Sequence, residues 1–236
     1  MNKETIAAIA TGLTDSGIGI IRISGSEAIE IGGRLFRTPS GKKNADWESH
    51  KLYYGYVVDP KKEKALEKWT DSVVDEVMAV AMKAPRSFTG EDTVEIQCHG
   101  GVLVMRKILA LALENGASLA EPGEFTKRAF LSGRIDLSRA EAVMDVIQSQ
   151  NEYALSASVR QLNGRLSEQI KKMRAGLIYE IALIESALDD PEHISLNGYS
   201  GQLYEKLGEL IGRIDRLAAT AENGRLIKEG IRTVIV

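Results

Sequence analysis

Arg22 is the first residue of this chain whose type and position could contribute to a ligand-binding or catalytic site. It lies in GIGIIRISG, Gly17 to Gly25, where alternation predicts a strand with Ile18 and Ile20 on the same face as the arginine. A guanidinium within such an apolar run is costly unless it is paired or faces a ligand. Spacing alone favours the plainer interpretation, in which the head of Arg22 reaches solvent or an internal ion pair.

Glu95 occupies a comparable position. The segment Thr93 to His99 alternates, which places Glu95 and Gln97 on one face of a predicted strand and Cys98 on the other. If the polar face lines a pocket, the carboxylate can accept two parallel hydrogen bonds from an amidine-like edge, such as that of a pterin ring. If it faces solvent, the pattern indicates only an amphipathic strand, and spacing favours that alternative.

A third candidate lies in a densely charged segment, Glu121 to Ala142. Arg134 follows Gly133 at a tight turn between two predicted helix starts. Ligand sites often form at such junctions, so Arg134 joins Arg22 and Glu95 as a residue worth testing.

Other site signatures are missing from the sequence. No G-x-x-x-x-G-K-[ST] motif occurs, and GIG at Gly17 lacks the third glycine of a dinucleotide fingerprint. The histidines are scattered, at His50, His99 and His193, so no metal site is expected. Cys98 lies on the apolar face of its predicted strand, which favours packing over a nucleophilic role.

The elements that must position the candidates follow from hydrophobic periodicity. Short apolar runs bounded by turn residues predict strands over Ile6 to Ala10, Ile18 to Ile23, Leu52 to Val58, Val77 to Met82 and Thr93 to His99. Helical spacing predicts helices over Ser26 to Phe36 and about Val102 to Glu114, and Lys61 to Lys64 is expected in an exposed loop. Strands that alternate with helices indicate an α/β or α+β domain.

After about residue 119 the pattern becomes helical. A short helix is expected over Glu124 to Leu131. The sequence SRAE, beginning at Ser138, forms a capping-box pattern at the head of a helix or helix pair, roughly 50 residues long, that needs other helices to cover its apolar stripe. Another amphipathic helix is expected from about Gly201 to Glu222.

The composition is that of a folded protein without an overall basic surface. The 236 residues include 30 Lys+Arg and 33 Asp+Glu, a net charge of −3, which excludes a wholly basic nucleic-acid-binding surface but not a local patch. One cysteine cannot form an internal disulfide, the N-terminal apolar run is too short for a secretory signal, and no run reaches membrane-spanning length. We therefore expect a soluble, cytoplasmic protein of one or two domains.

Three long motifs resemble one protein family. They are, in chain order, GIGIIRISG (Gly17 to Gly25), SFTGEDTVEIQCHGG (Ser87 to Gly101) and PGEFTKRAFLSGRIDLSRAEAV (Pro122 to Val143). They resemble the bacterial tRNA uridine-modification GTPase family MnmE, also called TrmE, in the right order and over nearly the whole chain.

The resemblance implies an α+β fold with two kinds of domain. A mixed α/β domain, similar to folate-dependent aminomethyltransferases, is expected to bind folate and dimerise at residues 1–119, and the first part of a helical bundle is expected at 120–222. Residues 223–236 would form a linker and the first strand of a G domain, because a run like GIRTVIV leads into the phosphate-binding loop in the family. The sequence is thus expected to stop just before the GTPase site.

The family's activity is implied by the same resemblance. A homodimer, working with the flavoprotein MnmG (GidA), would add a carboxymethylaminomethyl-type group to the wobble uridine of certain tRNAs, with GTP hydrolysis that uses Mg²⁺ and K⁺. The N-terminal domain would bind 5-formyltetrahydrofolate or a related one-carbon tetrahydrofolate. Because the phosphate-binding loop is missing here, no catalytic residue and no K⁺ or Mg²⁺ site is expected in this chain.

Carried over motif by motif, the family's folate contacts fall on Arg22, Glu95 and Arg134. The third position is basic in the family, and here it is arginine. The resemblance implies that Glu95 takes the N–H edge of the pterin and that the arginines meet carbonyl or carboxylate oxygens of the folate. Two alternatives stay open: a dimerisation platform with a vestigial folate pocket, and a stand-alone folate-dependent aminomethyltransferase.

Overall fold

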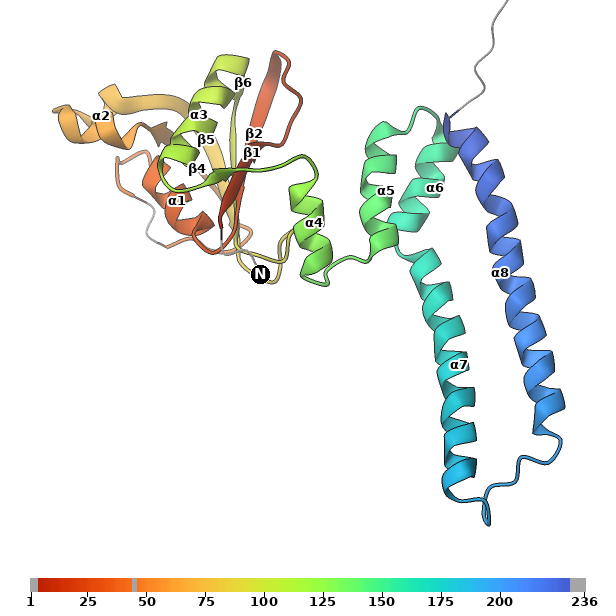
Figure 1. The fold of residues 1–236 in the computed structure, drawn as a ribbon. Coiled ribbons are helices and arrows are strands. Elements are labelled where there is room, and N and C mark those ends of the chain that lie inside the picture. The colour runs from red at the N-terminus through yellow and green to blue at the C-terminus, as the bar shows by residue number, and fades with distance from the viewer. Residues whose placement is uncertain (1–3, 44–45, 230–236) are drawn as a thin grey trace, which may run out of the picture. The chain divides into compact units, whose positions relative to one another are not determined.

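The chain forms two compact units, Met1–Ile135 and Asp136–Val236. The computed structural model describes residues 4–43 and 46–229, with side chains described as far as residue 219 (Figure 1). The strand expected over Ile231 to Val236 lies outside the described residues.

A seven-stranded sheet is the centre of the first unit. Its strands are β1 (Ile6–Ile9), β2 (Ser16–Ser24), β3 (Phe36–Arg37), β4 (Leu52–Val58), β5 (Val73–Met82), β6 (Thr93–Gly100) and β7 (Ser118–Leu119). They lie in the order β3-β4-β5-β6-β2-β1-β7, and every neighbouring pair is antiparallel except β1 with β7. The five strands expected from the sequence are confirmed.

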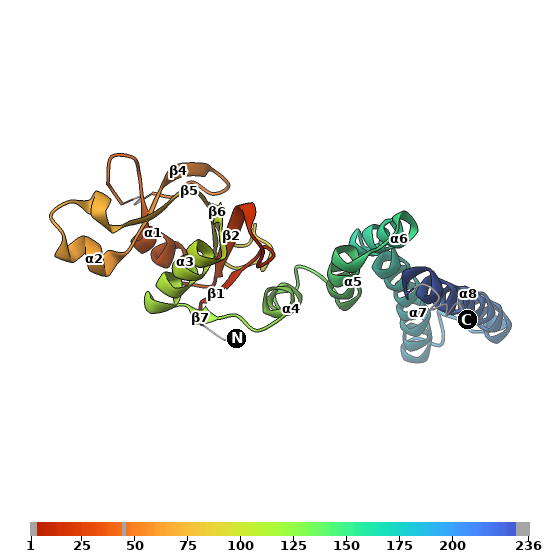
Figure 2. The ribbon, with the colours of Figure 1, turned by 90° about the horizontal axis from the view of Figure 1, so that it is seen from above.

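One face of the sheet carries the core. The helices α1 (Ala28–Leu35) and α3 (Val102–Glu114) lie against this face and against each other (Figure 2). Both helices were expected. The fully buried side chains that strands and helices share include Ile21, Ile23, Val94, Ile96, Ile31, Leu35 and Ile108.

The prediction of an exposed loop at Lys61 to Lys64 is wrong, because these residues lie in the short helix α2 (Pro60–Ala65). The Asp59 carboxylate accepts hydrogen bonds from the backbone N–H groups of Lys61 and Lys62, and Pro60 occupies the first helical position. A capping acid followed by proline begins a helix even where the side chains are all polar. A single 3-10 turn, η1 (Trp69–Ser72), connects this region to β5.

The opposite face of the sheet is open over much of its width. Ile18, Leu52 and Tyr54 lie on this face and are 61%, 48% and 46% exposed. The alternation expected for β6 is confirmed, since Val94, Ile96 and Cys98 are buried in the core, while Glu95, Gln97 and His99 lie on the open face. This open face carries Arg22 and Glu95.

The helix α4 (Glu124–Leu131), expected with these bounds, belongs to the first unit. Its Arg128 guanidinium donates to the carboxylates of Glu124 and Glu91, at 2.9 and 3.2 Å, and to the backbone oxygen of Glu4 at 2.9 Å. These contacts tie α4 to the loop before β6 and to the N-terminal segment. The first unit therefore extends to Ile135, past the boundary expected at residue 119.

The second unit is helical, as expected. It contains α5 (Leu137–Gln148), α6 (Glu152–Leu162), α7 (Arg165–Asp189) and α8 (Tyr199–Glu229). The long helix or helix pair expected after Ser138 is instead three helices. Asn151 caps α6 by accepting a hydrogen bond from the Ala154 N–H at 2.8 Å, and Gly164, with φ +83°, separates α6 from α7.

The prediction that Ser138 caps its helix is also wrong. The cap of α5 is Asp136, whose carboxylate accepts from the Arg139 N–H at 3.0 Å and from the hydroxyls of Ser167 and Ser138. An ionised carboxylate stabilises a helix N-terminus more than a hydroxyl does. The hydrogen bond from Ser167, together with that from Ser138, lowers the pKa of Asp136 to about 2.

Helices α7 and α8 leave an apolar groove between them. Its volume is about 460 Å³, and it is lined by Leu166, Ile170, Met173, Arg174, Leu177, Leu210, Ile214, Leu217 and Ala218. The apolar stripes of these helices are therefore not fully covered within the described residues.

Candidate functional site

Arg22 and Glu95 form an ion pair across two strands. Antiparallel pairing of β2 with β6 places the two residues directly opposite each other. Arg22 Nε donates to Glu95 Oε1 at 2.7 Å, and the side chains are 25% and 16% exposed. Within the described residues Glu95 Oε2 accepts no protein hydrogen bond, so this oxygen is free to accept from a ligand. Of the two plainer interpretations of Arg22, a head in solvent or an internal ion pair, the structure shows the ion pair, and its partner is the second candidate residue.

Two aromatic rings enclose the Arg22 guanidinium. Its central carbon lies 5.5 Å from the centroid of the Phe88 ring and 5.5 Å from that of Phe125. Cation–π attraction of this kind stabilises a partly desolvated guanidinium and fixes its plane. Sequence reasoning did not single out either phenylalanine, because the contacts join α4 and the loop before β6 to a strand far away in the chain.

A network of buried hydroxyl groups holds the loop that carries Phe88. Ser24 Oγ lies 2.7 Å from Thr89 Oγ1 and donates to the Glu91 carboxylate at 3.1 Å. Ser87 donates to the Glu91 backbone oxygen at 2.5 Å. Since Ser24, Ser87 and Thr89 are all buried, these hydrogen bonds form in a low dielectric and restrict the loop strongly. Phe88 is therefore presented to Arg22 by a rigid support.

Arg134 lines a cavity that begins at the same phenylalanine. The cavity has a volume of about 320 Å³ and is lined by His50, Met82, Pro85, Arg86, Ser87, Phe88 and Arg134. Phe88 thus contacts Arg22 on one side and this cavity on the other. The structure brings Arg22 and Glu95 into direct contact and connects Arg134 to them through the Phe88 ring.

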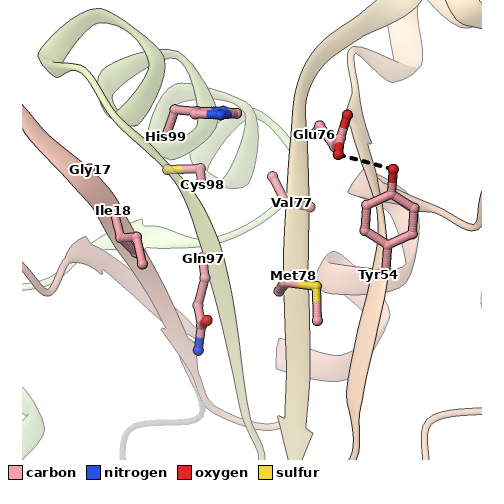
Figure 3. A pocket seen from close by; sticks show the side chains of 9 residues that line it. All are labelled: Gly17, Ile18, Tyr54, Glu76, Val77, Met78, Gln97, Cys98 and His99. Carbon is pink, nitrogen blue, oxygen red and sulfur yellow. Dashed lines mark hydrogen bonds between the residues drawn. The ribbon is translucent and has the colours of Figure 1, made fainter.

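A second cavity, of about 280 Å³, lies farther along the open face (Figure 3). Its lining includes Ile18, Met78, Gln97 and His99, and Tyr54 donates to the Glu76 carboxylate at its edge, at 3.0 Å. Its wall is more apolar than that of the cavity at Arg134, because methionine and isoleucine contribute much of it.

His99 is oriented by a carboxylate beside this second cavity. Asp75 accepts from the His99 backbone N–H at 2.8 Å and lies 2.7 Å from Nδ1. The side-chain hydrogen bond and the charge of Asp75 raise the pKa of His99 above its ordinary value. This residue was assigned no role from the sequence, and its partner carries no motif that would have revealed it.

Cys98 packs in the core, as its place in β6 predicts. It is 4% exposed, and burial raises the pKa of its thiol to about 11, so the thiol is protonated near neutral pH and is a poor nucleophile. Within residues 4–43 and 46–229, no three histidine, cysteine or acidic side chains converge on a common metal position. In the same part of the chain, no helix combines the length and the apolar character that crossing a membrane requires.

Comparison with known proteins places both units in one family. The sequence profile of the family described as the GTP-binding protein TrmE N-terminus matches residues 5–134, and that of the MnmE helical domain matches residues 137–233. These ranges agree with the two compact units of the structure.

Whole-chain relatives agree with the profiles. The chain is 51% identical over 237 residues to the tRNA modification GTPase MnmE of Lachnoclostridium phytofermentans, an alignment that spans all of this chain and 50% of the relative. It is 45% identical to that of Geobacillus kaustophilus and 44% identical to that of Bacillus subtilis, over 99% of this chain and 49% of each relative. The chain thus spans about half the length of the curated relatives it matches. It belongs to the MnmE (TrmE) family of tRNA modification GTPases.

Proposed function

We propose that the first unit binds a one-carbon tetrahydrofolate, such as 5-formyltetrahydrofolate, at Arg22, Glu95 and Arg134. The observation that carries the proposal is the half-buried Arg22–Glu95 pair beside a cation-lined cavity. The pterin ring of a folate presents adjacent N–H donors, which a carboxylate can accept in parallel. Glu95 Oε2 is free for one of them, and Oε1, which accepts from Arg22, has a further lone pair for the other. The ligand's carbonyl and carboxylate oxygens are met by guanidinium groups.

Each residue has a separate task in this proposal. Glu95 fixes the plane of the pterin, and Arg22 orients the Glu95 carboxylate through their hydrogen bond. Phe88 and Phe125 hold the Arg22 guanidinium in place and exclude water from it. The folate itself would supply the one-carbon unit, while the chain's own residues bind and orient it.

The proposal extends to the assembly in which this chain works. The chain forms a homodimer through its first unit, and the open sheet face, with Ile18, Leu52 and Tyr54 exposed, supports this. With a G domain that binds GTP, Mg²⁺ and K⁺, and with the flavoprotein MnmG, the full protein installs an aminomethyl-type group on the wobble uridine of tRNA in the cytoplasm. The 236 residues lack the phosphate-binding loop motif, so GTP hydrolysis is assigned to the family's G domain.

Calorimetric titration tests folate binding by this chain. Wild-type chain should bind 5-formyltetrahydrofolate saturably near one ligand per chain. Glu95→Gln removes the charge of the acceptor but keeps its size, and a charge-assisted hydrogen bond contributes about 1.5–3 kcal/mol, so affinity should fall by roughly tenfold or more. The matched control is Glu30→Gln, which removes an exposed carboxylate on α1 that pairs only with Arg34 within the described residues.

The outcomes separate the proposal from its alternative. Weakened binding by Glu95→Gln together with unchanged binding by Glu30→Gln supports a folate site at Glu95. Equal affinity of all three folded proteins would place any folate elsewhere. A folded wild-type chain that binds no folate would favour a dimerisation platform with a vestigial pocket.

Light scattering during size-exclusion chromatography tests the dimer. Wild-type chain should elute at twice the mass of one chain. Leu52→Asp, on the open face, should give a monomer, while Leu13→Asp, at a leucine of similar exposure outside the sheet, should leave the dimer intact. A monomeric wild-type chain would contradict dimerisation through this unit.

A further inference from the structure

The cavity beside Phe88 is lined by hydrogen-bond donors and cations. Its charged or titratable side chains are Arg86, Arg134 and His50, and no carboxylate lines it. Its one hydroxyl, that of Ser87, is already engaged with a backbone oxygen. A site that offers donors without acceptors is suited to an anionic ligand.

Neither guanidinium of this cavity has an internal partner. Within the described part of the chain, Arg86 and Arg134 make no side-chain hydrogen bond and no ion pair, whereas Arg22, Arg37 and Arg128 are all paired with acids. Two unpaired positive charges on one cavity repel each other, and an anion between them would relieve that repulsion. Both side chains are exposed, so water screens them in the empty cavity, and both guanidinium groups remain available to donate to an anion.

His50 adds a third donor from a strained position. It is the only non-glycine residue with positive φ, +65°, in the described residues, and such strain persists where the surrounding structure enforces it, often at binding sites. Its backbone N–H donates to Ala81 at 2.8 Å, and Nδ1 lies 2.8 Å from Ser49 Oγ, which accepts from the Lys83 N–H. In the tautomer in which the Ser49 hydroxyl donates to Nδ1, the ring proton resides on Nε2, and that nitrogen is left to donate to a ligand.

We infer that this cavity is a subsite for the carboxylates of the folate's glutamyl tail, with Arg86 as a specificity-determining residue beside Arg134. The inference rests on the proposed folate site. A tetrahydrofolate carries N–H donors at its pterin end and carboxylates at its tail, and the first unit carries a free acceptor at Glu95 and free donors across the Phe88 ring. The acceptor at Glu95 thus suits the donor end of the ligand, and the donors of the cavity suit its carboxylate end. Longer glutamyl tails, with more carboxylates, bind more tightly.

Binding of three ligands to three variants tests the inference. The ligands are 5-formyltetrahydrofolate with one glutamate, its triglutamate form, and 5-formyltetrahydropteroate, which lacks the tail. The variants are Arg86→Met, Glu95→Gln and the control Lys83→Met, which removes an exposed positive charge close in sequence that does not line the cavity. Thermal unfolding of each variant confirms that it folds.

Arg86→Met should weaken binding of the glutamate forms by about tenfold, more for the triglutamate, and leave binding of the pteroate within twofold. Lys83→Met should stay within twofold of wild type for all ligands. If Arg86→Met binds the glutamate-bearing folates normally and Glu95→Gln binds them more weakly, the tail subsite is overturned and the folate site remains supported. Normal affinity in both variants would overturn the folate site itself. Displacement of the tail by millimolar inorganic phosphate, without preference for the triglutamate, would show a phosphate site instead and also overturn the inference.

Discussion

Arg128 is the residue whose removal should most weaken the first unit. Its side chain is 8% exposed and joins three separate segments through Glu91, Glu124 and the backbone oxygen of Glu4. Arg128→Met preserves much of the side-chain length and apolar volume but removes the charge. Two carboxylates, 32% and 14% exposed, would then lose their common partner.

The expected loss is about 3 kcal/mol in the free energy of unfolding. Breaking a buried pair by removing one partner costs about 3–5 kcal/mol, and the partial exposure of Glu91 brings the figure to the lower end. Both tryptophans of the chain, Trp47 and Trp69, belong to the first unit, so their fluorescence reports unfolding of that unit alone. With a slope of roughly 2 kcal/mol per molar urea, the midpoint should fall by about 1.5 M.

The matched control is Arg106→Met, an exposed arginine on α3 without a partner in the described residues. Its midpoint should move by less than about 0.3 M, since surface substitutions usually change stability by less than 0.5 kcal/mol. If Arg128→Met shifts the midpoint no more than Arg106→Met does, α4, which carries Phe125, is not anchored through this guanidinium.

Three other perturbations have definite expected results. A Cβ at Gly55 would come within 2.1 Å of a backbone oxygen, whereas one at Gly17 meets nothing within 4 Å. In the same urea assay, Gly55→Ala should therefore lower the free energy of unfolding by about 2 kcal/mol or more, and Gly17→Ala should lower it much less. Equal losses would contradict the packing around Gly55. Asp136→Ala should cost the helical unit about 1 kcal/mol. Serine hydroxyls lower the pKa of that carboxyl from 3.8 to about 2, so the stability it contributes is present above pH 3.8 and is lost as pH falls through 2. Melts of wild type and Asp136→Ala, followed by circular dichroism, should therefore differ above pH 3.8 and converge near pH 2. An equal difference at both pH values would refute the capping role. Because the pKa of His99 is raised, its imidazolium contributes stability below pH 6.5, and this stability is lost as pH rises through the folded-state pKa. An NMR titration of His99 should give a midpoint above 6.5 in wild type and one closer to 6.5 in Asp75→Asn. Identical midpoints in the two proteins would show that the pair does not form.

The regular elements of the first unit could be predicted because each carries its own periodic signal. The alternation over Thr93 to His99 and the helical spacing over Val102 to Glu114 determine which face of each element is buried. Local polar chemistry was harder to interpret. The lysines of α2 concealed a helix begun by Asp59 and Pro60, and a favourable capping box at Ser138 concealed the stronger acid cap two residues earlier.

Some residues of the candidate site could likewise be predicted from the sequence, and others could not. Arg22 and Glu95 could be singled out because a charge within an apolar run is anomalous, and the family motifs name them together with Arg134. Phe88 and Arg86 could not, because their environment depends on how the loop before β6 folds over the sheet. The contact between Arg22 and Phe88 joins residues more than sixty positions apart, and no local pattern reports such a contact.

Nuclear Overhauser contacts between bound 5-formyltetrahydrofolate and the phenylalanine rings test the central claim most directly. The chain has four phenylalanines, so their ring signals can be labelled and assigned, and Phe36, fully buried in the core, serves as an internal control. The proposed site predicts contacts from the ligand to Phe88 and Phe125 and none to Phe36. A ligand that contacts only the cavity at His99, or no phenylalanine ring at all, would contradict a folate site built on the Arg22–Glu95 pair.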